Sequence, residues 1–166
     1  MKTTVRKFFF AWDFDKEEKW LNDMAAQGKA LTGVGFCKYI FEDCEPGEYT
    51  VRLELLENHT AHEKSVQYLD FLRETGAEYI GNYFRWVYLR KKCADGEFEL
   101  YSDNASRIRH LNRIIALLAP ISLANIAIGL SVHSIINLAI GVLGLYGTLR
   151  LHKKRKRIVS DAQLYE

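Results

Sequence analysis

The stretch from Ile114 to Leu149 contains no Asp, Glu, Lys or Arg, in a chain of which 27% is charged. One membrane-crossing helix needs about 20 apolar residues, so this stretch is too long for one crossing and suits two short ones. Its most polar point is Ser131–Ser134, where the chain is expected to turn. The sequence therefore predicts one helix over Ile114–Leu130 and a returning helix over Ile135–Leu151.

Basic residues lie at both ends of this apolar stretch, whereas the turn between its helices carries no fixed charge. Because segments rich in Lys and Arg stay on the cytoplasmic side of a membrane, both ends are expected there. This predicts a multi-pass protein of the cell membrane, in contact with the lipid bilayer, with both termini cytoplasmic. A hairpin buried in a soluble oligomer is the alternative, but neither helix shows a polar face. The residues expected to determine the topology are Arg107, Arg109, Arg113, Lys153, Lys154, Arg155, Lys156 and Arg157.

Three strongly polar side chains lie within the apolar stretch: Asn125, His133 and Asn137. Polar groups inside a membrane are candidates for function. Two Asn on facing helices can equally form a structural hydrogen bond, and this is the interpretation that we favour. Gly141 and Gly144 indicate close helix approach, either within the hairpin or between two copies of it.

The chain divides into an acidic part and a basic, apolar part. Residues 1–106 contain 14 Lys and Arg against 19 Asp and Glu, whereas residues 107–157 contain nine Lys and Arg and no acid. Direct nucleic-acid binding is not expected, because it needs a basic surface. The three cysteines form no CxxC pair and are expected to be reduced in the cytoplasm.

Residues 1–93 are expected to form a ferredoxin-like βαββαβ sandwich of the α+β class, in which two helices cover one face of a four-stranded sheet. Residues 94–113 are read as a linker and the start of a basic helix, 114–151 as the transmembrane hairpin, and 152–166 as a basic cytoplasmic tail. The elements predicted from periodicity and turn signals are strands Val5–Trp12, Ala30–Glu42, Tyr49–Leu55 and Glu78–Lys91, with helices from Asp15 to Gly28 and from Thr60 to Gly76.

The uncovered face of such a sheet would be rich in large aromatic side chains. A surface of this kind is rarely left in water, so a partner, a second copy, a small ligand or the linker is expected to cover it. In the linker, residues 98–101 are candidates to lie back on the sheet. The predicted partner or ligand patch consists of Phe8, Phe10, Trp12, Tyr79, Tyr83 and Arg85.

No constellation of residues in the sequence indicates catalysis, and no cofactor or metal site is predicted. His59 and His62 lie at a helix start without a third ligand, which is weak as a metal motif. The sequence Gly33-Val34-Gly35 lies within a predicted strand, so it does not form a phosphate-binding loop. The acids from Asp13 to Glu18 suit a helix N-terminus through the helix dipole. The protein is therefore not expected to be an enzyme.

Seven short stretches, spread through most of residues 5–110, together form a recognisable pattern: Phe9–Trp12, Glu17–Ala25, Pro46–Tyr49, Glu57–His59, Glu74–Tyr79, Arg85–Tyr88 and Phe98–Asp103. Taken together, these stretches resemble a bacterial family known as domain of unknown function 2812. Members of that family often carry C-terminal membrane spans. Their genes commonly neighbour PadR-type transcriptional regulators, so the resemblance implies a regulatory partner and supplies no site residues.

Three functional hypotheses follow. The first is a membrane-anchored cytoplasmic adaptor or sensor that binds and modulates a protein partner, with a PadR-type repressor as the expected one. The second is a small-molecule sensor that binds apolar or cationic compounds against the aromatic side chains. The third is a membrane protein without a catalytic role that self-assembles, with open faces paired in a homodimer.

Overall fold

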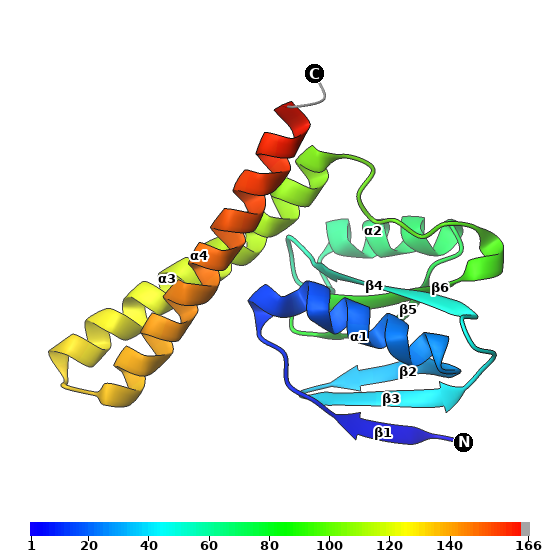
Figure 1. The fold of residues 1–166 in the computed structure, drawn as a ribbon, viewed down its shortest axis with the longest axis horizontal. Helices are drawn as coiled ribbons and strands as arrows, with labels where there is room; N and C mark the ends of the chain where they lie inside the picture. Colours follow the sequence, from blue (N-terminus) through cyan, green and yellow to red (C-terminus); the bar gives the residue numbers. More distant parts are fainter. Residues whose placement is uncertain (164–166) are drawn as a thin grey trace. The chain divides into compact units, whose positions relative to one another are not determined.

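The computed structural model describes residues 1–163, which form two compact units, Met1–Leu100 and the residues from Tyr101 onward (Figure 1). The first unit is of the α+β class and contains two three-stranded antiparallel sheets. The second unit consists of two long apolar helices.

The first sheet is built from the N-terminal part of unit one. Its strand order is β1-β3-β2, and both pairings are antiparallel. A short 3-10 helix, η1, leads into helix α1, which Gly28 ends in the left-handed conformation. The elements are β1 Thr3–Arg6, η1 Ala11–Asp13, α1 Phe14–Ala26, β2 Lys29–Gly35 and β3 Lys38–Asp43.

The second sheet repeats this plan. Its strand order is β4-β6-β5, so the first strand again pairs with the third and the third with the second. Gly76, with a positive φ, follows helix α2 as Gly28 follows α1. The elements are β4 Tyr49–Leu55, α2 Glu63–Glu74, β5 Glu78–Tyr83, β6 Trp86–Lys92 and a short 3-10 helix, η2, Cys93–Asp95.

Unit one is therefore an internal repeat of a strand–helix–strand–strand motif, which the sequence analysis did not detect. The pairs Gly28 and Gly76, Gly33 and Gly81, and Phe36 and Phe84 are each 48 residues apart. The register shifts just before Gly33 in the first sheet and just before Gly81 in the second, so even the bulge recurs. Two copies of one motif account for both sheets.

The predicted four-stranded ferredoxin-like sheet is replaced by six strands, because two predicted strands are hairpins. The chain from Ala30 to Glu42 turns at Phe36 and Cys37, and the chain from Glu78 to Lys91 turns at Phe84 and Arg85. Cys37 and Phe84 have φ values of 50° and 58°, a conformation that usually selects Gly or Asn. Because neither position is Gly or Asn, the sequence gives no signal for either turn.

The predicted element starts are also corrected in places. The strand expected over Val5–Trp12 ends at Arg6, because Ala11–Asp13 forms η1. Helix α1 begins at Phe14 without a side-chain cap, so Asp15 and Glu18 do not form a capping box. Helix α2 begins at Glu63, where the N-cap is the His62 side chain, which accepts a hydrogen bond from the backbone N–H of Lys64.

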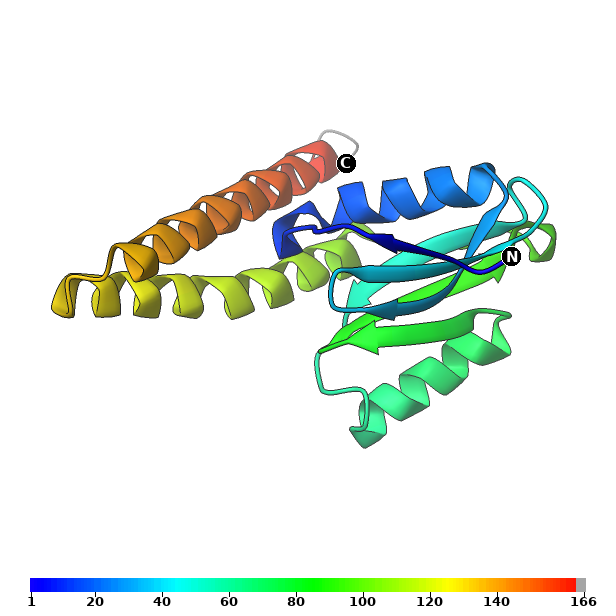
Figure 2. The same cartoon turned by 90° about the horizontal axis from the view of Figure 1, so that it is seen from below.

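The two helices of unit one lie on opposite sides of the strands, and not on one face as predicted (Figure 2). The core beneath α1 joins both repeats, since Leu21, Phe41 and Leu53 belong to one buried cluster. The core beneath α2 contains Val87, Leu89 and, from the linker, Phe98, with Leu100 packed against it. The prediction that the linker lies back on the sheet is thus confirmed for Phe98.

Unit two is an antiparallel pair of helices, α3 Asn104–Ser131 and α4 Ile135–Gln163. Both are long and apolar enough to cross a membrane, and only 17% and 22% of their most apolar windows are buried. The predicted turn lies at Val132–Ser134, where His133 has a φ of 53°. The Asp103 side chain accepts a hydrogen bond from the backbone N–H of Ser106 and so caps α3.

The two apolar helices are in close contact through small residues. A Cβ atom on Gly141 would lie 2.8 Å from the backbone oxygen of Ser122, so packing within the hairpin explains this glycine. The Asn125 side chain donates to the carbonyl oxygen of Ile121 at 2.8 Å, one turn earlier in its own helix. This bond within one helix takes the place of the expected pairing between Asn125 and Asn137.

Candidate ligand-binding site

A pocket of about 140 Å³ lies in unit one, where the turns of the two β-hairpins meet the segment between β1 and α1. Strands β2 and β5 lie side by side. Arg90 of β6 also connects the two repeats, because its Nη1 atom donates to the Leu31 carbonyl oxygen of β2 at 2.8 Å. The turns that follow β2 and β5 lie at the same end of these strands. The Phe36 and Tyr83 rings meet there, with centroids 5.5 Å apart. Both repeats therefore contribute walls to one pocket.

Glu17 is the acidic residue of this pocket and comes from the first turn of α1. Only 8% of its surface is exposed. Its Oε1 atom accepts hydrogen bonds from the Tyr39 and Tyr88 hydroxyls, both at 2.7 Å. Burial raises the pKa of the carboxyl group, and the two hydrogen bonds oppose that rise in part.

The two tyrosines are donors that keep their protons. Burial first, and then the nearby Glu17 charge, raises the pKa of both Tyr39 and Tyr88 above the ordinary value for a phenol. Tyr39 comes from β3 of the first repeat and Tyr88 from β6 of the second. One carboxyl group therefore links the two repeats through neutral hydroxyls.

Aromatic rings form most of the pocket wall. Phe14 and Trp86 face each other with centroids 5.8 Å apart, and Tyr39 and Tyr88 lie 6.4 Å apart. Lys7 also lines the pocket, and its ammonium lies 5.0 Å from the ring centroid of Phe9, another lining residue, and 4.5 Å from that of Trp20, which is outside the lining. The pocket therefore already contains one cation of the chain's own, against the Phe9 ring.

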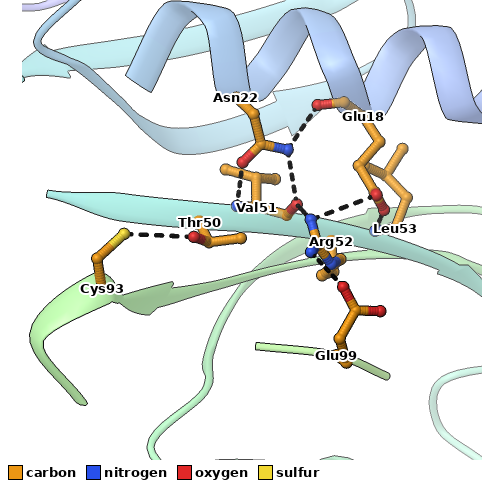
Figure 3. A network of polar contacts seen from close by, with 8 residues as sticks. All are labelled: Glu18, Asn22, Thr50, Val51, Arg52, Leu53, Cys93 and Glu99. Carbon is orange, nitrogen blue, oxygen red and sulfur yellow. Dashed lines mark hydrogen bonds and ion pairs between the residues drawn. The ribbon is translucent and has the colours of Figure 1, made fainter. Parts of the chain in front are cut away.

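Side chains of α1 fix the helix that carries Glu17 against strand β4. Glu18 Oε2 accepts from the Leu53 backbone N–H at 2.9 Å, and the Asn22 side-chain amide hydrogen-bonds both backbone groups of Val51 (Figure 3). Arg52 then connects Glu18 to Glu99 of the linker. Burial is the main cause of a raised pKa at Glu18 as well. These contacts replace the missing neighbour of an edge strand.

The structure brings only part of the predicted patch to this pocket. Phe8 and Tyr83 line it. Phe10 stacks on the buried Trp12, with centroids 4.4 Å apart, and both lie outside the lining. Tyr79 packs against the core beneath α2, and Arg85 donates from Nε to the Leu56 carbonyl oxygen.

The sequence analysis missed Glu17, Tyr39 and Tyr88. A signal for Glu17 was present, because Glu17, Leu21 and Ala25 follow at intervals of four residues and all three are buried on one face of α1. An acid on the apolar face of a helix is a candidate for function. The tyrosines gave no such signal, because their convergence depends on two hairpins that were read as single strands.

The basic residues of unit two gather at one end of its helix pair. Arg107, Arg109 and Arg113 lie near the start of α3, and the cluster from Lys153 to Arg157 lies beyond the apolar part of α4. Arg155 Nη1 donates to Asn112 Oδ1 at 3.0 Å, which links these two ends. The eight basic residues expected to determine the topology therefore lie at one end of the helix pair.

One family model matches the chain. It is described as "Protein of unknown function (DUF2812)" and matches residues 13–123, which is more than half of the chain. This range includes α1 with Glu17, both sheets of the pocket except β1, and most of α3. No curated protein and no solved structure matches. The chain therefore belongs to the DUF2812 family of proteins of unknown function.

Proposed function

We propose that the protein is a membrane-anchored sensor, in which unit one binds a small organic molecule and unit two holds it at the membrane. The observation that carries this proposal is the aromatic pocket around Glu17. Small-molecule sites are concave and mostly apolar, with few polar groups that orient the ligand. Glu17 and two tyrosine hydroxyls match that pattern.

The two tyrosine hydroxyls of the pocket are suited to binding and not to proton transfer. A general acid or base works best with a pKa near the ambient pH, and Tyr39 and Tyr88 have pKa values raised well above it. Their hydroxyls therefore act as fixed donors that orient the Glu17 carboxyl group. A group held in this way can recognise a ligand without changing it.

A ligand could be sensed through the link between the repeats. Glu17 bonds Tyr39 of the first repeat and Tyr88 of the second, so a molecule that competes for this carboxyl group changes both contacts. A ligand shifts an equilibrium only as far as it interacts differently with the two states. Competition for the Glu17 hydrogen bonds supplies such a difference.

The membrane arrangement is part of the proposal. Basic residues at one end of the helix pair favour a hairpin that enters and leaves from the cytoplasm. Unit one, which precedes α3, and the basic end of α4 would then both be cytoplasmic. The anchor would keep the pocket near compounds that gather at the membrane surface.

The proposal is tested by ligand-dependent melting of the full-length protein in nanodiscs against a panel of apolar and cationic compounds. We expect at least one compound to raise the melting temperature by several degrees. Ala11→Leu, which narrows the pocket, should abolish that rise, and Ala61→Leu, at an exposed turn, should preserve it. If no compound raised the melting temperature, or if a compound raised it equally in both variants, binding in this pocket would be refuted.

A protein partner is the second candidate function. The hairpin turns expose Phe36, Tyr83 and Phe84, with 70%, 41% and 75% of their surfaces accessible, and adjacent aromatic side chains of this kind favour an interface. Crosslinking from native membranes with the tagged full-length chain tests it, with a PadR-type regulator as the expected product. If alanine at Tyr83 and Arg85 left capture unchanged in the folded protein, this patch would not be the interface.

A further inference from the structure

The buried carboxyl group of Glu17 indicates the charge of a molecule that the pocket can bind. Glu17 is almost fully buried, and its two hydrogen bonds are with the neutral hydroxyls of Tyr39 and Tyr88. Among the residues that the structure describes, no Lys or Arg forms an ion pair with Glu17, and no hydrogen bond reaches its Oε2 atom. Buried carboxylates are usually paired with a cation. Glu17 therefore suits an occupant that brings a positive charge.

The aromatic wall points to the same charge. Ring faces attract cations, and an anion would be repelled by both the ring faces and Glu17. A metal ion would require several oxygen, nitrogen or sulfur ligands, and within the described residues no group of His, Cys, Asp and Glu is suitably placed. Lys7 lines the same pocket, and among the described residues its ammonium forms no ion pair with Glu17 but lies over the ring of Phe9, so an organic ammonium suits the aromatic part of this wall.

The size of the pocket limits the occupant. A volume of about 140 Å³ is close to that of a cavity known to hold one benzene-sized molecule. One ring or one compact ammonium group therefore fits inside, and the rest of a larger ligand would extend out of the pocket beside the hairpin turns. The exposed rings of Phe36 and Tyr83 lie on that path.

We infer that the Glu17 pocket binds a small organic monocation, with its positive group against Glu17 and its apolar part among Phe14, Tyr39 and Trp86. This inference rests on the proposed sensor function and names its ligand class. The cation replaces the missing counter-charge of Glu17, and the rings contact the apolar remainder. A neutral molecule of the same shape gains only the ring contacts.

Two probes of matched shape test the ligand class: benzyltrimethylammonium and its uncharged carbon isostere, (2,2-dimethylpropyl)benzene. Each is titrated at pH 7.5 into the wild-type full-length chain in phosphatidylcholine nanodiscs, with empty nanodiscs as the reference for partition into lipid. We expect the cation to bind at least tenfold more tightly than the isostere. This comparison needs no variant, so it holds whether or not a substituted chain folds.

Substitution of Glu17 then locates the charge. Glu17→Gln should lower the affinity for the cation at least tenfold and change the affinity for the isostere less than twofold. Asp23→Asn is the matched control, because Asp23 is an exposed acid of the same helix that pairs with Lys19 and lies outside the pocket lining, and this variant should bind both probes as the wild type does.

Three outcomes would overturn the inference. Equal binding of both probes, or an unchanged cation affinity in a folded Glu17→Gln chain, would refute a cation site while small-molecule binding stands. Failure of both probes to bind would also refute it. In that case the compound panel and the Ala11→Leu variant decide separately whether the pocket binds any ligand.

Discussion

Asn22 hydrogen-bonds both backbone groups of Val51, accepting from its N–H at 2.8 Å and donating to its carbonyl at 3.0 Å. A side-chain amide thus imitates a neighbouring β-strand at the edge of β4. The edge is closed by helix α1, which also carries Glu17. Removing this amide would leave the partly buried Val51 N–H without a partner, whereas the Val51 carbonyl oxygen would still accept from Arg52 Nη1 at 3.2 Å.

We therefore predict that Asn22→Ala lowers the free energy of unfolding of unit one by about 1–3 kcal/mol. The Val51 amide should also exchange its hydrogen faster than in the wild type, while the Leu53 amide, held by Glu18, should change less. Hydrogen exchange followed by mass spectrometry on the full-length protein measures both. Unchanged protection at Val51 would show that the amide does not hold this edge.

The raised pKa of Glu17 predicts how stability depends on pH. The folded protein binds the proton of this carboxyl group more tightly than the unfolded chain does, whose value is near 4.5. The stability that this proton provides is fully present below about pH 4.5 and is lost as pH rises through the folded-state pKa. Glu17→Gln should lack this loss.

The difference in unfolding free energy between Glu17→Gln and the wild type should therefore move in favour of the variant as pH rises from 4.5, and then become constant. Each tenfold difference in proton affinity between the folded and unfolded states is worth about 1.4 kcal/mol. Denaturant titrations of both proteins between pH 4 and 8 measure the difference. A difference that stays level across that range would contradict a raised pKa at Glu17.

Close packing within the apolar hairpin makes a third prediction. Gly141→Leu should lower the thermal stability of the helix pair by about 2 kcal/mol or more, because its Cβ would lie 2.6 Å from Ile126 Cγ1 and 2.8 Å from the Ser122 backbone oxygen. Val142→Leu, at the next and exposed position, is the matched control and should be nearly neutral. Calorimetry of the full-length protein in mild detergent compares the two. Equal melting temperatures of the two variants would show that Gly141 does not determine the contact between α3 and α4.

The proposed topology predicts which sites a membrane-impermeant maleimide reaches in intact cells. A cysteine introduced as His133→Cys, in the turn between the spans, should be labelled from outside. The native Cys93, which is exposed in unit one, should be labelled only after the membrane is permeabilised. Labelling of Cys93 in intact cells would reverse the proposed orientation.

Much of the fold could be predicted because some elements carry their whole signal locally. Tyr49–Leu55 alternates apolar and polar residues and forms β4 with the predicted bounds. Gly28 and Gly76 mark the helix ends, and the uncharged stretch contains the turn between α3 and α4. In each case the pattern lies within a few residues of the structure that it predicts.

The remaining features depend on contacts between distant residues. Cys37 and Phe84 adopt positive φ angles without glycine, so neither hairpin turn has a sequence signature. With both turns missed, the repeat and the convergence of Tyr39 and Tyr88 on Glu17 could not be seen. Trp12, predicted for an open face, is instead buried. Alternation cannot tell a central strand from a segment that folds back into the core.

The repeat of unit one has a consequence for how many ligands a chain can hold. The counterpart of Glu17 at the 48-residue spacing is Ser65, which is buried and donates from Oγ to the Asn58 carbonyl oxygen. The two halves share connectivity and turns, yet only one supplies the acid, and the other supplies Tyr88 to it. Saturation is therefore expected at one molecule for each chain, and cooperative binding would require association between chains.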